Sequence, residues 1–340
     1  MTQMMRAAVV TELGRPLELR EVAVPEAGPG QVLVRVRASG VCHTDLHAAT
    51  GDWPVKPSVP FIPGHEGVGE VAVVGQGVTH LKEGDRVGVP WLHTACARCD
   101  HCMGGWETLC ESQQMTGYTV DGAYADYVRA DADYVGVLPD SLDFGTAAPV
   151  LCAGVTVYKG LKETEVRPGQ WVAISGIGGL GHMAVQYAKA MGMRVIAVDI
   201  AEDKLALARD LGADETIDAS RSDAAAEVQA QIGGAHGALV TAVGNAAFSQ
   251  AVAMLRRRGT IAMVGVPPGS FPLPIFETVV KRLTVRGSIV GTRLDLREAL
   301  GFAARGEVKT HFNWGKLDDI NGIFDRMRAG KIDGRVVLEI

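Results

Sequence analysis

Four cysteines within fifteen residues constrain the fold of this chain more strongly than any other feature of its sequence. Cys96, Cys99, Cys102 and Cys110 follow the spacing Cys-x2-Cys-x2-Cys-x7-Cys. Four thiolates in one loop can close a tetrahedral zinc and leave no position open for water, so the spacing predicts a structural zinc site. An iron–sulfur cluster and a redox dithiol are alternative uses of these thiols, but no other feature of the sequence supports either.

The other two cysteines, Cys42 and Cys152, lie far apart in the sequence and near other chemically useful residues. Together with His65 they could supply two thiolates and one imidazole to a second zinc and leave its fourth position open. Such a site suits alcohol chemistry, because the metal lowers the pKa of a bound hydroxyl and polarises a carbonyl. Spacing alone does not bring the three residues together, and each could instead be an ordinary buried residue.

The composition is that of a globular protein large enough for two domains. The chain has 340 residues, of which 47% are hydrophobic and 21% charged, and a formal net charge of -6. This balance gives no basic surface suited to nucleic acid. We find neither an apolar signal segment nor a run of ~18 apolar residues, so we expect a cytoplasmic protein outside the membrane. In that reducing compartment regularly spaced cysteines are expected to bind metal or act in catalysis.

The hydrophobic pattern changes near Cys152. Before it, alternating runs such as residues 32–37 and frequent glycine and proline turns predict a β-rich domain with long loops. After it, apolar runs alternate with glycine turns and helical stretches, which predicts a doubly wound parallel sheet and therefore an α/β protein. The predicted strands are residues 171–174, 194–199, 238–243 and 260–264, and helices are predicted at 182–191 and 204–211.

A glycine motif in residues 176–181, Gly-Ile-Gly-Gly-Leu-Gly, lies between a predicted strand and a predicted helix. In that context the glycines allow a tight turn, the approach of a pyrophosphate and close packing of helix on strand. Asp199 ends the next predicted strand, where a carboxylate can bind an adenosine ribose and would repel a 2′-phosphate. NAD is therefore favoured over NADP. Lys204 could reach the same ribose or be a solvated lysine on a helix.

Three motifs occur in the order found in zinc-dependent alcohol dehydrogenases of the medium-chain dehydrogenase/reductase superfamily, and the chain resembles this family from end to end. They are Gly64-His65-Glu66-x2-Gly69-x5-Gly75-x2-Val78, the four-cysteine loop, and the glycine motif with Asp199. The resemblance, closest to the microbial tetrameric type, implies a GroES-like catalytic domain that holds both zinc sites and a Rossmann NAD-binding domain. The implied boundaries are residues 1–153 with 288–340 for the catalytic domain and 154–287 for the NAD-binding domain.

The resemblance also implies roles for residues around the second zinc. Its ligands would be Cys42, His65 and Cys152, with Glu66 close behind the metal as a transient ligand. Asp45 would fix the tautomer of His65, although it could also be a turn aspartate. Thr44 would bind the substrate hydroxyl and pass its proton through the cofactor ribose to His47, which by itself would be a surface histidine. The residues with implied catalytic roles are thus Thr44, His47, Glu66 and Asp45.

Two further groups of residues are assigned by resemblance. Trp53 and Trp91 would narrow the pocket to short primary alcohols, although tryptophans in such loops can also be core residues. His43 and Arg335 would contact the coenzyme phosphates, and Thr156 would pack beside the nicotinamide. The full set of implied cofactor-binding residues is His43, Thr156, Gly176, Gly178, Gly179, Leu180, Gly181, Asp199, Lys204, Val266, Val290 and Arg335.

The sequence thus leads us to expect an enzyme of the EC 1.1.1.1 type. It would oxidise short primary alcohols reversibly with NAD, hold one catalytic and one structural zinc per subunit, and form a cytoplasmic homotetramer. Aryl-alcohol, polyol and formaldehyde dehydrogenases on the same scaffold are close alternatives. An alternative from a different class is a zinc module that binds a partner or nucleic acid through the four-cysteine segment. A zinc-free quinone reductase of the same superfamily is a further alternative.

Overall fold

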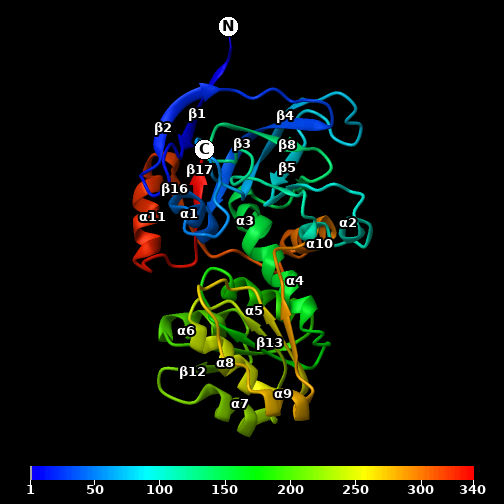
Figure 1. The fold of residues 1–340 in the computed structure, drawn as a ribbon, viewed down its shortest axis with the longest axis vertical. Helices are drawn as coiled ribbons and strands as arrows, with labels where there is room; N and C mark the ends of the chain where they lie inside the picture. Colours follow the sequence, from blue (N-terminus) through cyan, green and yellow to red (C-terminus); the bar gives the residue numbers. More distant parts are fainter. Residues whose placement is uncertain (1) are drawn as a thin grey trace. The chain divides into compact units, whose positions relative to one another are not determined.

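The computed structural model describes residues 2–340, and the chain forms two compact units. Unit 1 comprises the chain up to residue 152 together with residues 292–304 and 310–340. Unit 2 comprises residues 153–291 and 305–309, most of which are green to yellow in Figure 1. None of the helices in residues 2–340 is both long and apolar enough to cross a membrane.

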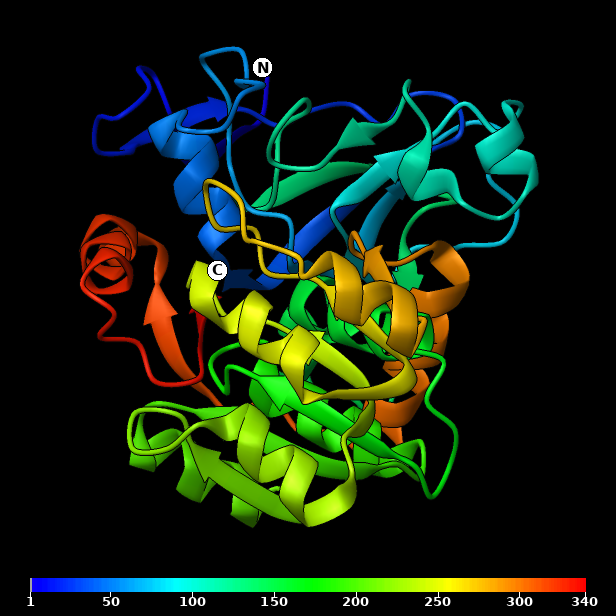
Figure 2. The same cartoon turned by 60° about the horizontal axis from the view of Figure 1, so that its bottom comes forward.

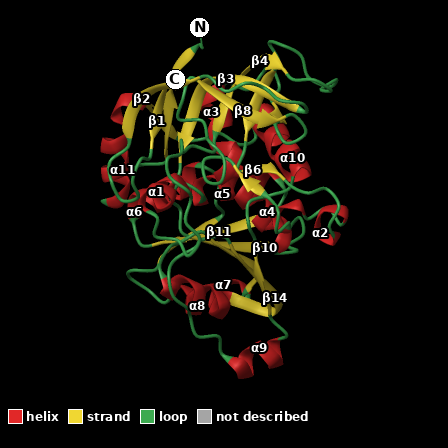
Figure 3. Ribbon diagram, turned by 45° about the horizontal axis from the view of Figure 1, so that its top comes forward, coloured by secondary structure: helices red, strands yellow, loops and turns green. Residues whose placement is uncertain are grey.

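Unit 1 is built on a β-sheet whose central strand is β3, Gln31–Val41 (Figure 3). Val32, Val34 and Val36 are buried and Arg35 is exposed, as the alternating pattern predicts. The valines pack with residues of β4, β5 and β8 in one hydrophobic core. The path through the sheet is β16 (Phe312–Lys316), β17 (Arg335–Glu339), β3, β4 (Gly67–Val74), β5 (Arg86–Val89) and β9 (Gly136–Val137), and β8 (Tyr127–Asp131) also pairs with β3.

Two short ribbons and several helices complete unit 1. The ribbons are β1 (Met4–Val9) with β2 (Glu18–Ala23), and β6 (Leu92–Thr94) with β7 (Gln114–Met115). The helices are α1 (His43–Thr50), α2 (Asp100–Met103), α3 (Phe144–Pro149), α10 (Arg293–Ala304) and α11 (Ile320–Arg328), with short helical turns at Glu107–Leu109 and Leu317–Asp319. A π-helical turn, Val150–Gly154, follows α3 and carries Cys152.

Unit 2 contains a six-stranded parallel sheet in the order β12-β11-β10-β13-β14-β15 within the described residues (Figure 2). Ala173, Ile196, Ala238 and Ile261 lie side by side on four neighbouring strands, and each is completely buried. The strands are β10 (Trp171–Ser175), β11 (Arg194–Asp199), β12 (Glu215–Asp218), β13 (Ala235–Val240), β14 (Leu255–Met263) and β15 (Thr284–Gly287). The helices are α4 (Val155–Glu163), α5 (Gly181–Ala190), α6 (Glu202–Asp210), α7 (Ala224–Ile232), α8 (Asn245–Met254) and α9 (Ile275–Lys281).

The structure confirms the doubly wound α/β architecture, with one shifted strand. The strand predicted at residues 238–243 lies instead at Ala235–Val240. After Val240 the backbone N–H groups of Thr241 and Ala242 both bond to Ser175 O, at 3.0 and 3.1 Å, which ends the regular pairing, and Val243 beyond them is exposed. The strand order reverses at β10, whose neighbours are β11 and β13. In such sheets ligands bind at this reversal, beyond the carboxyl ends of the strands, and the glycine motif begins there.

Candidate active site

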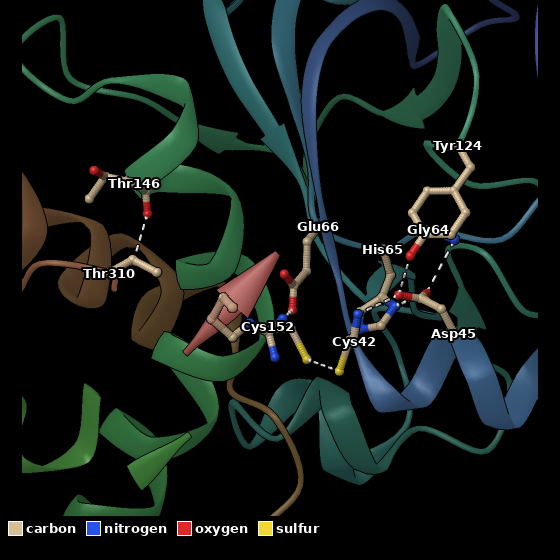
Figure 4. Close-up of polar contacts among 10 residues, drawn as sticks. Cys42, Asp45, Gly64, His65, Glu66, Tyr124, Thr146, Cys152 and Thr310 are labelled. Carbon is tan, nitrogen blue, oxygen red and sulfur yellow. Dashed lines mark hydrogen bonds and ion pairs between the residues drawn. The ribbon is translucent and has the colours of Figure 1, made fainter. Parts of the chain in front are cut away.

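Asp45 is the centre of the hydrogen-bonding network at the junction of β3 and α1 (Figure 4). Its fully buried carboxylate accepts from the backbone N–H of Cys42 at 2.9 Å and that of Gly64 at 3.2 Å. It also accepts from His65 Nδ1 at 2.7 Å and from the hydroxyl of Tyr124 at 2.8 Å. Four donors therefore hold this carboxylate, and the carboxylate in turn fixes the ring of His65 with Nε2 on the opposite side.

A buried group of potential metal ligands lies beside this network. Ligand atoms of Cys42, His65, Glu66 and Cys152 all lie within 4.8 Å of one another, and the two sulfur atoms are 4.0 Å apart. Within residues 2–340, His65 Nε2 is buried and has no hydrogen-bond partner. A buried imidazole nitrogen left without a partner beside two thiols fits a bound zinc ion, for which these are the preferred donor types.

The pKa values of this group shift in different directions, and only the shift of Cys42 favours the form that a metal binds, which is the thiolate. Burial opposes protonation of His65, but the Asp45 carboxylate outweighs burial and holds the pKa of His65 well above its usual value. The hydrogen bond from Cys152 holds the pKa of the Cys42 thiol well below its usual range. Burial raises the pKa of Glu66 to about 7. One thiolate therefore forms readily in the pair of cysteines.

Glu66 is held by Arg335, which the sheet brings alongside it. Arg335 begins β17, and its Nη2 donates to Glu66 Oε1 in an ion pair that is buried on both sides. The other oxygen, Oε2, has no partner within the described chain, and a Cβ at Gly40 would lie 1.8 Å from it. Position 40 must therefore be glycine for Glu66 to lie here. Arg335, assigned above to a coenzyme phosphate, is only 4% exposed.

His47 lies one turn after Thr44 on α1, so the two side chains share a face of the helix. Gly51 ends α1 in the left-handed conformation, at a φ of 72°, and turns the chain back toward the helix. This turn places Asp52 Oδ1 2.9 Å from His47 Nδ1 and stacks Trp53 on the His47 ring, with centroids 5.3 Å apart. Asp52 thus accepts the Nδ1 proton and leaves Nε2 of His47 to accept another.

Aromatic rings connect the proposed proton acceptor to the metal-ligand group. Trp53 meets Trp91 edge to face at 6.5 Å, and Trp91 meets the His65 ring edge to face at 5.2 Å. Tyr118 contacts both indoles, at centroid distances of 5.8 Å from Trp53 and 5.5 Å from Trp91. The structure therefore brings both predicted pocket residues to one aromatic wall beside His65.

The four-cysteine segment forms a second group of potential metal ligands. The sulfur atoms of Cys96, Cys99, Cys102 and Cys110 lie within 4.8 Å of one another. Backbone N–H groups of Arg98 and Cys99 lower the pKa of the Cys96 thiol to about 6, so a thiolate forms there near neutral pH. Because these four thiols converge, the site suits a zinc ion without an open position.

The glycine motif of unit 2 has the geometry of a phosphate-binding loop. Gly176 has a φ of 93°, and a Cβ there would lie 2.8 Å from the backbone nitrogen of Ala242. A Cβ on Gly181 would lie 1.9 Å from Gly176 O, so helix α5 packs here only with glycine. A Cβ on Gly178 would meet nothing within 4 Å. The space over Gly178 at the start of α5 therefore fits an approaching pyrophosphate.

Asp199 at the end of β11 shapes the same loop. Its Oδ2 accepts from the backbone N–H of Ile177 at 2.6 Å, and its Oδ1 accepts from those of Ile200 and Ala201 at 2.7 and 3.1 Å. The carboxylate is thus fixed at the point where a ribose of a bound dinucleotide would lie. Lys204 lies in α6, with its Nζ 3.5 Å from Asp203 Oδ2.

The other residues that the resemblance assigns to cofactor binding differ in burial and in backbone conformation. Thr156 is buried in α4, and His43 is exposed at the start of α1. Val266 is 73% exposed. Val290 has a φ of 39°, which is strained for a β-branched residue. Gly179 and Leu180 lie in the loop before α5.

Sequence reasoning missed three residues that the structure places in the site. Tyr124 donates to Asp45, Asp52 binds His47, and Tyr118 lies against both tryptophans. Tyr118 and Tyr124 come from a part of the chain with no motif of its own. Only Asp52 had a signal, because it follows the glycine that turns the chain back toward His47.

Comparisons with known proteins show the family and the fold of the chain. A model of the alcohol dehydrogenase GroES-like domain matches residues 28–140 and one of zinc-binding dehydrogenases matches residues 179–305, which confirms the expected GroES-like fold. An alcohol dehydrogenase of Rhizobium meliloti (strain 1021) is 68% identical over 99% of both chains. Another, of Geobacillus stearothermophilus, is 58% identical over 99% of this chain and 100% of the relative. The solved structure of the alcohol dehydrogenase of the hyperthermophilic archaeon Aeropyrum pernix has a TM-score of 0.89 at 35% identity, and the match covers 98% of this chain and 100% of that one.

Proposed function

The chain belongs to the zinc-type medium-chain alcohol dehydrogenases, and from this premise we propose that it oxidises short primary alcohols reversibly to aldehydes with NAD, as an enzyme of the EC 1.1.1.1 type. The observation that carries the proposal is the buried convergence of Cys42, His65 and Cys152, whose ligand atoms lie within 4.8 Å of one another. Two thiols and one imidazole hold a zinc ion with room for a fourth ligand, as alcohol chemistry requires.

Unit 1 is the catalytic domain in this proposal. Zinc bound by Cys42, His65 and Cys152 would polarise the oxygen of the substrate and lower the pKa of its hydroxyl. Asp45 keeps His65 in the tautomer that presents Nε2, because the carboxylate accepts from Nδ1 at 2.7 Å. Glu66, held by Arg335, lies close enough to exchange with a ligand.

The proton of the alcohol leaves through side chains of α1. Thr44 would hydrogen-bond the substrate hydroxyl and accept its proton while it releases its own hydroxyl proton toward His47, which would deliver a proton to solvent. Asp52 supports this role because it holds Nδ1–H of His47 at 2.9 Å and leaves Nε2 as the proton acceptor. The half-exposed ring of His47 can exchange protons with water.

Unit 2 is the coenzyme domain. The open space at Gly178 and the N-terminus of α5 support binding of a pyrophosphate, and NAD would supply the hydride acceptor. The carboxylate of Asp199 favours NAD, because it would repel the 2′-phosphate of NADP. The other proposed coenzyme contacts are His43, Thr156, Gly176, Gly179, Leu180, Gly181, Lys204, Val266, Val290 and Arg335.

Pocket size and assembly complete the proposal. Trp91 contacts the ring of His65 and Trp53 contacts Trp91, so the two indoles would remove volume near the reacting carbon and favour short primary alcohols. The four-cysteine site binds the structural zinc, which gives two zinc ions per subunit. We further propose a cytoplasmic homotetramer.

Zinc content and NADH formation, measured on one preparation, test the proposal. We expect two zinc ions per chain, NADH formed from NAD rather than NADPH from NADP, and a higher kcat/KM for ethanol than for benzyl alcohol. The matched variant Cys152→Ser should retain the structural zinc and lose alcohol oxidation. A preference for aryl alcohols, polyols or formaldehyde would instead favour a related dehydrogenase. A chain with one zinc or none and no activity on alcohols would contradict the proposal.

A further inference from the structure

We propose that Tyr118 is a positioning residue that fixes Trp53 against the aromatic wall and thereby sets the size of the alcohol that the site accepts. This inference rests on the proposed function and deepens it. Tyr118 is 4% exposed, and its ring contacts both Trp53 and Trp91. Its hydroxyl donates to the backbone oxygen of Val55, two residues after Trp53.

The segment that carries Trp53 has little backbone support of its own. Residues 52–60 make no backbone-to-backbone hydrogen bond within the described chain; such bonds occur at Gly51 before the segment and at Phe61 after it. A segment without such bonds takes its position from side-chain contacts, and its local stability is correspondingly low. For Trp53 these contacts are the rings of His47, Trp91 and Tyr118.

Tyr118, in contrast, lies on a well-supported turn. The turn follows β7, which pairs with β6, and the backbone N–H of Thr116 bonds to Trp91 O at 2.9 Å. The N–H of Tyr118 bonds to Met115 O at 3.2 Å. Tyr118 is therefore fixed relative to Trp91. Because its hydroxyl donates to Val55 O, it also holds the segment that carries Trp53 in a fixed position relative to Trp91.

The consequence concerns where the indole of Trp53 lies relative to the metal-ligand group. Trp91 contacts the ring of His65 at 5.2 Å, and Tyr118 contacts both Trp91 and Trp53, so Tyr118 holds Trp53 in place next to the indole that lies against His65. Without the hydroxyl of Tyr118, Val55 O loses its donor and the segment can move outward with Trp53. A larger or longer alcohol then fits, because pocket volume near the reacting carbon decides which chain length is accepted.

Tyr118→Phe tests the inference because it removes the hydroxyl and keeps the ring. We expect the ratio of kcat/KM for 1-hexanol to that for ethanol to rise roughly ten-fold. Tyr127→Phe, on β8 in the same unit, is the matched control and should leave the ratio unchanged. A ratio that stays at the wild-type value in Tyr118→Phe would overturn the inference.

A second readout does not depend on activity. In protein labelled with 5-fluorotryptophan, the 19F resonance of Trp53 is assigned by its loss in Trp53→Phe. In Tyr118→Phe we expect this resonance to shift and to become more accessible to a soluble relaxation agent, while that of the exposed Trp314 on β16 stays unchanged. A changed chain-length ratio with an unchanged Trp53 resonance would overturn the positioning role. If the wild type oxidises no alcohol, the proposed function fails, and the 19F shift still decides whether Tyr118 fixes Trp53.

Discussion

At the scale of single residues, Asp45 shows how one carboxylate can organise a metal site without binding the metal. Its four donors come from three separate parts of the chain, at Cys42, at Gly64 with His65, and at Tyr124. A buried carboxylate with this many donors is fixed in position and keeps the imidazole in one tautomer. The position of His65 Nε2 is therefore a property of the network and not of the histidine alone.

We predict that Asp45→Asn weakens zinc binding at the Cys42, His65 and Cys152 site by about 10- to 100-fold. An amide carries no charge and can present its NH2 group to His65. The ring then loses the acceptor that holds the proton on Nδ1, and Nε2 becomes less basic. Competition with a chromophoric chelator measures the affinity, and the four-cysteine site provides an internal control. The matched variant Asp52→Asn, which removes a carboxylate from His47 and not from His65, should keep its zinc. Equal zinc affinity in Asp45→Asn and wild type would refute this role.

The buried His93 on β6 leads us to predict that the free energy of unfolding depends on pH. Burial, with a smaller contribution from the charge of Arg129, lowers the pKa of His93 to about 4, against about 6.5 in an unfolded chain. As the pH falls from 6.5 to 4, the unfolded state takes up this proton first, so the free energy of unfolding decreases. At about 1.4 kcal/mol per pH unit the loss reaches roughly 3 kcal/mol near pH 4.

Urea unfolding of His93→Gln between pH 7 and pH 4 checks this prediction. The variant should lose less stability over this range than the wild type, because a glutamine side chain does not titrate. His101→Gln, at an exposed position of the neighbouring four-cysteine segment, is the matched control and should follow the wild-type curve. Parallel curves for His93→Gln and wild type would show that His93 does not contribute.

At the scale of elements, the four-cysteine segment is joined to α10 by one ion pair. Glu107, which is 6% exposed, lies in the helical turn before Cys110. Its Oε1 accepts from the backbone N–H and from Nε of Arg293, at 3.2 and 3.0 Å. Arg293 begins α10 and also lies over the ring of Tyr134. A local metal-binding segment is thus connected to a helix almost two hundred residues later in the sequence.

We predict that Glu107→Gln lowers the free energy of unfolding of unit 1 by about 1 to 2 kcal/mol without loss of the structural zinc. The loss is moderate because the Arg293 side chain is 47% exposed and water can replace part of the interaction. Urea unfolding together with zinc analysis measures both effects. Glu111→Gln, at an exposed position just after Cys110, should change neither. Loss of zinc from Glu107→Gln would contradict the prediction.

Elements also explain what the sequence could and could not predict. The four-cysteine segment and the glycine motif were predictable because their ligands or glycines are neighbours in the chain. The group around His65 depends on β3, β4 and β17 lying together, so the residues suggested it only with the help of a family resemblance. Tyr118 and Asp52 act through single side-chain contacts with a loop and with a helix end, the hydroxyl of Tyr118 with Val55 O and the carboxylate of Asp52 with His47, and such contacts leave no periodic pattern in a sequence.

At the scale of the whole molecule, the candidate metal sites and the candidate coenzyme site are divided between the two units. Both groups of metal ligands lie in unit 1, and the glycine motif with Asp199 lies in unit 2. Each unit has its own sheet and its own hydrophobic core. Metal and coenzyme should therefore stabilise different parts of the chain, because a ligand stabilises the structure that binds it.

Hydrogen exchange followed by mass spectrometry tests this division. Removal of zinc, at a chelator concentration that leaves the helical circular dichroism unchanged, should speed exchange in residues 42–66 and 92–115 and leave β10 and β11 protected. NAD should slow exchange in residues 176–201, and Asp199→Asn should reduce this effect, because the loop loses the charge that holds the N–H of Ile177. Faster exchange in β10 and β11 to the same extent as in the zinc segments would contradict the division. It would mean that the metal sites of unit 1 also maintain the fold of unit 2.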